Sequence, residues 1–337
     1  MISNRGDDRL GLCIVGCGRF AAEHARSARE RSDRVQLFFA SRSLDKAQAY
    51  AREHGADGAF GGYEEAVADP RVNALLYTTP HSQHKAHVEL AAAHGKHVLL
   101  EKPIATTLED AAAMAKTASQ AGIRFMVAEN YRYMPVVTAA ADLLRQGAIG
   151  VVHAIHMQAT TYERPTGWRL SRELMGGGAL IDGGIHLLSS MRMLAGEPSR
   201  ISAVTAPKIF PEMDGEEAVS LWTALPNGAV GTLNFSWAVQ GEEGSFGCVI
   251  VGSGGYISFD FFGSGVELSC GGEKRTIPAP GDGDGLGGLL DAFLAYVGSG
   301  EPSRSTPEEA TRDLAVVLAA YESVRAGGQP VEVPAGR

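Results

Sequence analysis

Residues 12–21 read Leu-Cys-Ile-Val-Gly-Cys-Gly-Arg-Phe-Ala, an apolar run followed directly by a G-x-G-x-x-A sequence. The apolar run predicts a buried strand over Leu12–Val15, and a helical pattern begins at Ala21. In this context Gly16 permits a tight turn and Gly18 lets the backbone approach a pyrophosphate, while small Ala21 allows close helix–strand packing. The helix N-terminus then offers N–H groups to the phosphates. The stretch therefore predicts a dinucleotide-binding domain rather than a plain strand–helix turn.

The same alternation of strand and helix continues to about Glu129. The expected strands are Leu12–Val15, Val35–Ala40, Ala74–Thr79, His97–Leu100 and Arg124–Ala128. The expected helices are Ala21–Arg31, Leu44–His54, Gln83–His94 and Leu108–Ala121. Continuous apolar strands that alternate with helices indicate a parallel sheet covered on both faces. We expect an α/β Rossmann domain, with a doubly wound parallel sheet, over residues 1–129.

The second half of the chain has a different pattern. Helices are expected at Pro135–Gln146, Gly178–Leu194 and Pro307–Arg325. Alternating strands are expected at Val151–Tyr162, Ile201–Ala206, Ala218–Leu225, Ala229–Ala238, Phe246–Val251, Tyr256–Phe262 and Val266–Cys270. Turn signals separate these strands, which indicates a mostly antiparallel sheet. We expect a second, α+β domain over residues 130–337, with a flexible glycine-rich loop at Pro280–Gly288.

Composition excludes several classes of protein. A length of 337 residues suits two domains, and four cysteines are too few for a disulfide scaffold. Thirty Lys plus Arg against 39 Asp plus Glu give a net charge of −9, which is unfavourable for binding nucleic acid. The polar N-terminus does not resemble a signal peptide, and the longest later apolar run, Leu314–Tyr321, is too short to span a bilayer. We expect a cytoplasmic protein with no nucleic-acid or membrane partner.

Five of the ten histidines lie close together in the sequence, at positions 81, 84, 87, 94 and 97. Such a cluster raises the question of a metal site. No cysteine or carboxylate joins the histidines at ligand spacing, so we expect a solvated helix face and no metal.

The end of the second expected strand bears on the choice of cofactor. An NAD site usually has Asp or Glu at this point, which accepts a hydrogen bond from the ribose 2′-hydroxyl. This chain has Ser41 and Arg42 instead, and the first carboxylate is Asp45. Ser41 could donate to a 2′-phosphate and Arg42 could pair with it. The pattern favours NADP over NAD, unless Arg42 is a solvated loop charge and Asp45 takes the ribose.

Two further motifs carry chemistry. Glu101-Lys102-Pro103 follows an expected strand, where a lysine can hydrogen-bond a substrate oxygen in the cofactor crevice. Residues 176–186 read Gly-Gly-Gly-Ala-Leu-Ile-Asp-Gly-Gly-Ile-His, which places Asp182 and His186 four residues apart on one face of a helix. Glycines in a helix interior cost about 1 kcal/mol each, and we interpret them as clearing space for a cofactor or substrate.

Taken in order, these motifs resemble the Gfo/Idh/MocA family of oxidoreductases over nearly the whole chain. Three other segments support the resemblance. They are Thr78-Thr79-Pro80-His81, Ala128-Glu129-Asn130-Tyr131-Arg132-Tyr133 and Gly167-Trp168-Arg169. The resemblance implies a Rossmann domain followed by a domain with a large open sheet, which in the family often forms the oligomer interface. It therefore implies a homodimer or homotetramer.

The resemblance also assigns residues to the site. It implies that Lys102, Asp182 and His186 form the catalytic set, and that the peptide before Pro103 is cis. The cofactor site is expected to comprise Gly16, Gly18, Arg19, Phe20, Ser41, Arg42, Thr79, Pro80, His81, Glu101, Lys102 and Asn130. Besides the catalytic set, the candidate substrate contacts are Tyr131, Arg132, Tyr162, Trp168 and Arg169, which suit a polyhydroxylated ring or could equally be packing residues.

The function that follows is an NADP(H)-dependent oxidoreductase that transfers a hydride between nicotinamide and a secondary alcohol or ketone of a sugar, polyol or sugar derivative. Histidine suits the proton transfer, and lysine suits stabilisation of charge on the oxygen. Three alternatives use the same scaffold. They are an NAD-dependent sugar or inositol dehydrogenase, a glycoside hydrolase with a tightly held NAD, and a non-catalytic nucleotide-sensing regulator.

Overall fold

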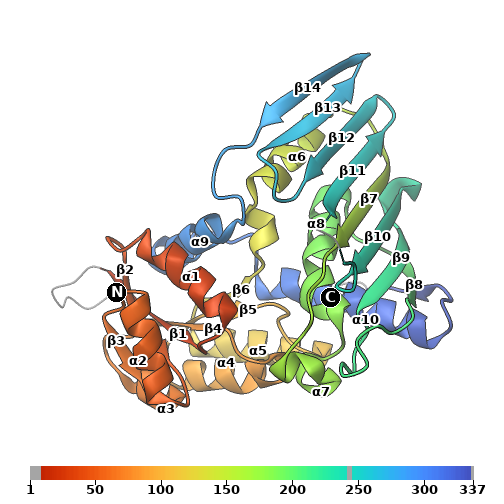
Figure 1. Cartoon of the computed structure of the whole chain (residues 1–337). Coiled ribbons are helices and arrows are strands. Elements are labelled where there is room, and N and C mark those ends of the chain that lie inside the picture. Colours follow the sequence, from red (N-terminus) through yellow and green to blue (C-terminus); the bar gives the residue numbers. More distant parts are fainter. Residues whose placement is uncertain (1–8, 241–244, 335–337) are drawn as a thin grey trace. The chain divides into compact units, whose positions relative to one another are not determined.

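The computed structural model describes residues 9–240 and 245–334 (Figure 1). Within these residues the chain forms two compact units. The first comprises residues 9–105, 109–128 and 286–307, and the second comprises residues 106–108, 129–285 and 308–334. The chain therefore returns to the first unit after residue 285. The expected division at residue 130 assigned all later residues to the second domain and did not include this return.

The first unit is built on a six-stranded parallel sheet of order β3-β2-β1-β4-β5-β6. The strands are β1 (Leu10–Val15), β2 (Val35–Ala40), β3 (Gly58–Phe60), β4 (Ala74–Tyr77), β5 (His97–Glu101) and β6 (Phe125–Ala128). The helices between them are α1 (Arg19–Arg29), α2 (Leu44–Glu53), α3 (Tyr63–Ala68), α4 (His84–Ala93) and α5 (Leu108–Ala121). The strand order reverses between β1 and β4, so the carboxyl ends of these strands form the switch point where such folds bind ligands. The doubly wound parallel fold is confirmed.

A later segment completes the first unit. Helix α9 (Leu286–Ser299) packs against α1. Arg31 makes a bidentate ion pair with Asp291, in which Nε donates to Oδ1 at 2.9 Å and Nη2 donates to Oδ2 at 2.8 Å. Beyond the helix, the carbonyl of Ser305 accepts a hydrogen bond from the N–H of Val127 in β6 at 3.0 Å. These contacts explain why the segment belongs with the Rossmann sheet.

The second unit contains a nine-stranded sheet of order β14-β13-β12-β11-β7-β10-β9-β8-β15. The strands are β7 (Val152–Thr160), β8 (Arg200–Thr205), β9 (Ala218–Ala224), β10 (Val230–Ser236), β11 (Ser245–Gly252), β12 (Gly255–Asp260), β13 (Gly265–Cys270), β14 (Glu273–Pro278) and β15 (Val331–Glu332). The pairs are antiparallel except for the parallel pair β7–β10. The large, mostly antiparallel sheet is therefore confirmed.

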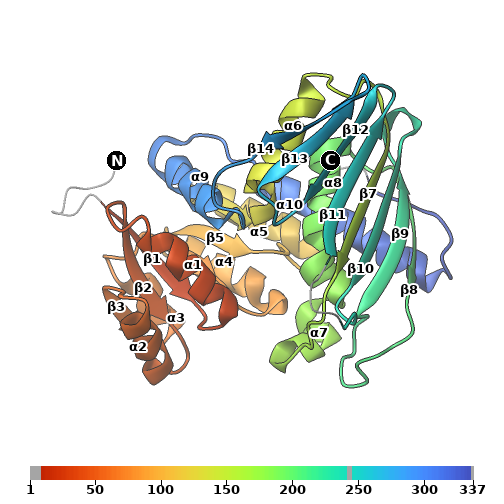
Figure 2. The same cartoon turned by 45° about the horizontal axis from the view of Figure 1, so that its top comes forward.

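Helices cover one face of this sheet (Figure 2). They are α6 (Pro135–Arg145), α8 (Ile185–Ala195) and α10 (Pro307–Arg325), and the short α7 (Arg172–Met175) precedes α8. Side chains alternate accordingly: Leu221 and Leu233, which pair in register, are buried, whereas Trp222, next to Leu221 in β9, is exposed. The period-2 pattern of the sequence thus divides the sheet into a core face and an open face.

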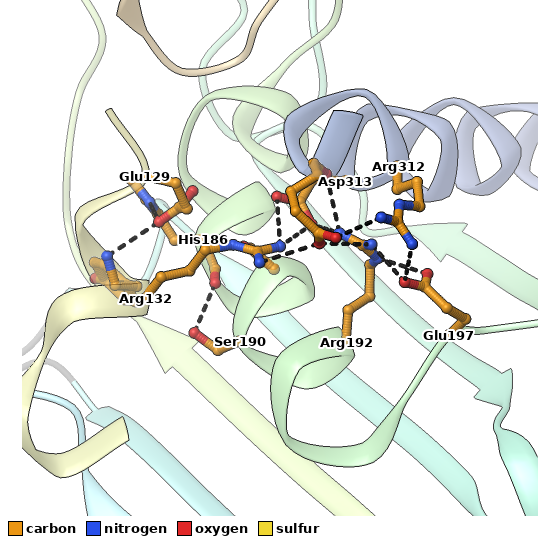
Figure 3. Close-up of polar contacts among 11 residues, drawn as sticks. Glu129, Arg132, His186, Ser190, Arg192, Glu197, Arg312 and Asp313 are labelled. Carbon is orange, nitrogen blue, oxygen red and sulfur yellow. Dashed lines mark hydrogen bonds and ion pairs between the residues drawn. The ribbon is translucent and has the colours of Figure 1, made fainter. Parts of the chain in front are cut away.

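A buried charge cluster ties the helical layer of the second unit together (Figure 3). Asp313 of α10 accepts from Arg132 Nη2 at 3.1 Å and also pairs with Arg192 of α8. Arg132 donates through Nε to Ser189 Oγ at 2.7 Å, and Arg192 pairs with Glu197 at 2.6 Å. Arg132, a candidate substrate contact from sequence, is here a buried member of an ion-pair network.

Candidate active site

The turn between β1 and α1 has the geometry that a pyrophosphate site requires. Gly16 adopts φ +101°, and a Cβ there would lie 2.9 Å from Thr78 Oγ1. Gly18 is the N-cap of the 11-residue helix α1, makes no side-chain cap hydrogen bond, and has open space within 4 Å of the position of a Cβ. A helix N-terminus beside open space, without a side-chain cap, fits a phosphate of a dinucleotide.

The carboxyl end of β2 presents Ser41 and Arg42. Ser41 is buried, and its Oγ accepts a hydrogen bond from Ser43 N at 3.3 Å. Arg42 is exposed and makes no hydrogen bond or ion pair with any described residue. Asp45 is also exposed, in the first turn of α2. The guanidinium of Arg42 is therefore not neutralised by a carboxylate of the described chain.

The loop after β5 carries Lys102 in a buried position. Lys102 is only 5% exposed, and its Nζ lies 5.5 Å from the centre of the Phe20 ring in the first turn of α1. The Lys102–Pro103 peptide is cis, as the family resemblance implies. Glu101, an expected cofactor contact, hydrogen-bonds His24 through Oε1 at 2.6 Å. The first unit thus brings Lys102 to the dinucleotide turn.

Three of the clustered histidines are buried, so the expected solvated helix face is wrong for His81, His84 and His87. His84 joins two loops, with Nδ1 2.9 Å from the Pro103 carbonyl and Nε2 3.2 Å from the Thr79 carbonyl. His87 Nδ1 lies 2.9 Å from Thr79 Oγ1. Burial lowers the pKa of His84 to about 3 and that of His87 to about 4, so both are neutral. These rings support the loops after β4 and β5.

Thr79, Pro80 and His81, which are expected cofactor contacts, lie in the first of these loops, with a short 3-10 helix over His81–Gln83. Among the described residues, no group of three or more histidines, cysteines or carboxylates is arranged to hold a metal ion.

In the second unit, the glycine-rich segment makes room for protein and not for a ligand. A π-helical turn over Leu180–Gly184 leads into α8. A Cβ at Gly178 would lie 2.3 Å from the Glu216 carbonyl oxygen, and one at Gly183 would lie 2.5 Å from Phe235 Cζ. The glycines therefore allow this segment to pack closely against other parts of the chain, and the interpretation that they clear space for a cofactor or substrate does not hold.

Asp182 lies at the centre of this turn and is 2% exposed. Its Oδ2 forms an ion pair with Arg169 Nη2 at 2.5 Å. The same guanidinium donates to Glu163 Oε1 at 2.6 Å and lies 5.3 Å from the centre of the Trp237 ring. Arg169, expected to contact substrate, thus holds the carboxylate of Asp182.

His186 is held by a residue that the sequence did not single out. Its Nδ1 lies 2.7 Å from Glu129 Oε1, across 57 positions of the chain (Figure 3). Tyr131 stacks on the imidazole with ring centres 4.4 Å apart and planes at 12°. The Nε2 atom has no hydrogen-bond partner among the described residues. The spacing of Asp182 and His186 suggested that they pair, but the carboxylate on the His186 ring is Glu129.

Glu129 escaped sequence reasoning because nothing in its local pattern shows which ring it faces. The one available signal was its position directly after a buried strand, where side chains line the crevice of an α/β sheet.

The other expected site residues have separate surroundings. Asn130, an expected cofactor contact, donates through Nδ2 to the Asp284 carbonyl at 2.6 Å and so holds the loop before α9. Tyr162 is 45% exposed and lines a surface pocket with Phe210 and Arg164. Trp168 is half-buried in the 3-10 helix Gly167–Leu170. The second unit thus groups Tyr131 with His186 and Arg169 with Asp182, while the first unit holds Lys102 and the dinucleotide turn.

The first unit has a Rossmann sheet with a glycine turn. The second has a mostly antiparallel sheet covered by helices, one of which carries a carboxylate-bound histidine. This combination defines a nucleotide-dependent oxidoreductase. Residues 10–129 match the family model described as the oxidoreductase family with an NAD-binding Rossmann fold. Residues 137–258 match the GFO/IDH/MocA C-terminal domain. The chain belongs to the Gfo/Idh/MocA family of oxidoreductases.

Individual relatives have related activities by name. The chain is 30% identical to trans-1,2-dihydrobenzene-1,2-diol dehydrogenase of Bos taurus, over 79% of each chain. It is 29% identical to 1,5-anhydro-D-fructose reductase of Ensifer adhaerens, over 98% of this chain and 99% of the relative. Its fold matches that of aldose-aldose oxidoreductase from Caulobacter crescentus, complexed with glycerol, with a TM-score of 0.87 at 27% identity, over 96% of this chain and 99% of that one.

One further property concerns membranes. Within residues 9–240 and 245–334, no helix combines the length and the apolar character that crossing a bilayer requires.

Proposed function

We propose that this protein is an NADP(H)-dependent oxidoreductase that interconverts a secondary alcohol and a ketone on a sugar, polyol or sugar derivative. The observation that carries the proposal is the environment of the His186 ring. The ring is hydrogen-bonded to Glu129 and stacked on Tyr131, and its Nε2 has no hydrogen-bond partner among the described residues. An imidazole nitrogen held in this way suits proton transfer.

The residues divide the chemistry as follows. In the oxidising direction His186 takes the hydroxyl proton of the substrate, and Lys102 donates a hydrogen bond to the same oxygen, which stabilises negative charge there. Asp182, fixed by Arg169, contributes a second carboxylate to the set. Bound NAD(P) supplies the hydride chemistry. The residues of the first unit that would hold it are those of the glycine turn and the loops after β2, β4 and β5.

The proposed preference for NADP rests on the end of β2. Arg42 offers an exposed guanidinium with no carboxylate partner among the described residues, and Ser41 lies next to it. A 2′-phosphate would supply the missing negative charge.

The proposed substrate class rests on the relatives. By name, the relatives act on a cyclic diol, an anhydro-sugar and aldoses. The feature shared by these compounds is a carbon that bears a hydroxyl or keto group. We propose that the substrate of this chain has the same feature on a ring. Tyr131, Tyr162 and Trp168 remain the proposed aromatic contacts to such a ring.

We also propose a homodimer or homotetramer formed through the open face of the nine-stranded sheet. Support comes from the apolar side chains on that face, namely Val204, Trp222, Val230, Val249, Val251 and Tyr256, all of them exposed. The register places them on the same side of the sheet. Exposed apolar patches of this kind mark association surfaces.

A panel of sugars, inositols and keto-sugars, followed at the nicotinamide absorbance with NADP(H) and with NAD(H), tests the function. We expect turnover with at least one carbohydrate and a higher kcat/KM with NADP(H). Turnover with NAD(H) only would overturn the cofactor preference. Release of an aglycone without net absorbance change would instead indicate the hydrolase, and nucleotide binding without any turnover would indicate the sensor.

A further inference from the structure

We propose that Glu129 is a positioning residue that fixes the tautomer of His186, with the proton on Nδ1 and the lone pair on Nε2. The role of this tautomer in turnover rests on the proposed function, but the tautomer itself does not, and the two are measured separately below.

The hydrogen-bonding capacity of Glu129 determines the tautomer. The residue is 2% exposed, and its Oε1 accepts from the backbone N–H of Tyr131 at 3.1 Å. The same oxygen lies 2.7 Å from His186 Nδ1. An ionised carboxylate only accepts hydrogen bonds, so Nδ1 must be the donor. A neutral ring that donates through Nδ1 has its acceptor nitrogen at Nε2.

Tyr131 supplies the second restraint on the ring. Glu129 is the N-cap of the 3-10 helix Asn130–Tyr133, so the residue that donates its N–H to the carboxylate is also the one that stacks on the imidazole. The Tyr131 ring is itself supported by Phe261, with ring centres 5.3 Å apart. The carboxylate sets the direction of the imidazole and the stacked ring sets its plane.

The charge balance around Glu129 differs from that around Asp182. Asp182 is already paired with the cation of Arg169. Glu129 Oε2 is buried and has no hydrogen-bond partner among the described residues. A buried carboxylate oxygen without a partner is costly in the resting state. A positive charge that forms on His186 would lower that cost, because it appears 2.7 Å from the same carboxylate.

This arrangement gives a defined proton step. In oxidation the O–H bond of the substrate breaks and an N–H bond forms at His186 Nε2. Bound NADP⁺ would accept the hydride that leaves the adjacent carbon with its electron pair, and the C=O bond would then be complete. Glu129 remains ionised and keeps its hydrogen bond from Nδ1, as the carboxylate of a Ser-His-Asp triad does.

The direct test is ¹⁵N NMR of the full chain labelled at histidine, with the His186 signals assigned by their loss in His186→Gln. We expect the neutral His186 ring of the wild type to carry its proton on Nδ1. In Glu129→Gln the side-chain amide can either accept from Nδ1 or donate to it, so the Nε2-protonated form should become populated. The matched control is Glu217→Gln, because Glu217 is also a 2%-exposed carboxylate that accepts from two backbone N–H groups, those of Ile209 and Phe210. It should keep the wild-type tautomer.

An Nε2-protonated wild-type ring, or an unchanged Nδ1-protonated ring in Glu129→Gln, would overturn the assignment. This readout requires no substrate, so it decides the role of Glu129 even where the carbohydrate panel finds no activity and the proposed function fails.

Kinetics with a substrate from the panel test the consequence for turnover. We expect Glu129→Gln to lower kcat by about 10-fold or more, because a histidine in the wrong tautomer loses part of the 10²- to 10⁴-fold gain of acid–base catalysis. The KM for NADP(H) should stay within about twofold of the wild-type value. Glu217→Gln should retain kcat within about twofold of the wild type. Wild-type kcat in Glu129→Gln, or an equal loss in both variants, would exclude a specific positioning role.

Discussion

Arg42 is the residue on which the cofactor preference depends. Replacement by alanine should weaken NADP binding by about 10- to 100-fold, because a charge-assisted contact to a phosphate is worth about 1.5–3 kcal/mol. NAD affinity should stay within about twofold. Arg52→Ala, which removes another exposed arginine from the last turn of α2, is the matched control and should change neither affinity. Calorimetric titration of each variant with both nucleotides measures the effect, and an equal loss for NADP and NAD would show that Arg42 does not read the 2′-phosphate.

At the same scale, the sequence predicts candidate site residues but not the residues that they contact. The four-residue spacing of Asp182 and His186 predicts that they share one helix face. The chain instead forms a π-helical turn across Leu180–Gly184, and the two side chains bind Arg169 and Glu129 respectively. Partners that lie 13 and 57 positions away depend on how elements pack, which no local period encodes.

Among the elements, α4 makes stability depend on pH. Burial lowers the pKa of His84 to about 3 and that of His87 to about 4, both below the ordinary value of 6.5. Below pH 6.5 the unfolded chain therefore binds protons that the folded chain excludes, so the free energy of unfolding falls as the pH falls toward 4. At pH 5, each of the two histidines should lower the free energy of unfolding by about 2 kcal/mol relative to neutral pH.

Urea unfolding between pH 7.5 and 5 measures this dependence. In His87→Asn the unfolded chain should take up about one proton fewer on unfolding. The slope of the free energy of unfolding against pH should therefore fall by about 1.4 kcal/mol per pH unit. His94→Asn, at the exposed end of the same helix, should keep the wild-type slope. An unchanged slope in His87→Asn would mean that this ring does not titrate on unfolding.

The elements that the sequence predicted best are those with the strongest periodicity. Val35–Ala40 and Leu108–Ala121 have the expected bounds, because an apolar run interrupted only by Gln36 and a long amphipathic pattern leave few alternatives. The three-residue β3 is too short to show a period. Strand β14 is exposed along most of its length and charged at Glu273, Lys274 and Arg275, so it lacks an apolar face.

Helix α9 was also missed. Its first turn contains Gly287 and Gly288, which read as a continuation of the preceding glycine-rich loop. It forms because Leu289, Leu290 and Phe293 are buried in the first unit. Tertiary packing here overrides the low helix propensity of glycine.

For the whole molecule, the open face of the nine-stranded sheet leads to a prediction about assembly. Trp222 and Val249 lie in one row across the sheet, joined in register through Thr232 and His156. The double variant Trp222→Lys/Val249→Lys places two charges in the proposed interface, where they lack partners. It should sediment as a single chain, whereas the wild type should sediment as a dimer or tetramer.

Glu273→Lys on the exposed strand β14 is the control for a change of charge alone and should keep the wild-type assembly. Circular dichroism should show an intact fold in all three proteins. A wild type that sediments as a single chain, or a double variant with the wild-type mass, would place the oligomer interface elsewhere or exclude one.

The most direct test of the central claim is the turnover of His186→Ala on a carbohydrate substrate from the panel. Loss of the proton acceptor should lower kcat by about 10²- to 10⁴-fold. The dissociation constant of NADP(H) should stay within about twofold, since the expected cofactor residues other than Asn130 lie in the Rossmann unit and His186 lies in the other. Turnover at the wild-type rate in His186→Ala would contradict the account.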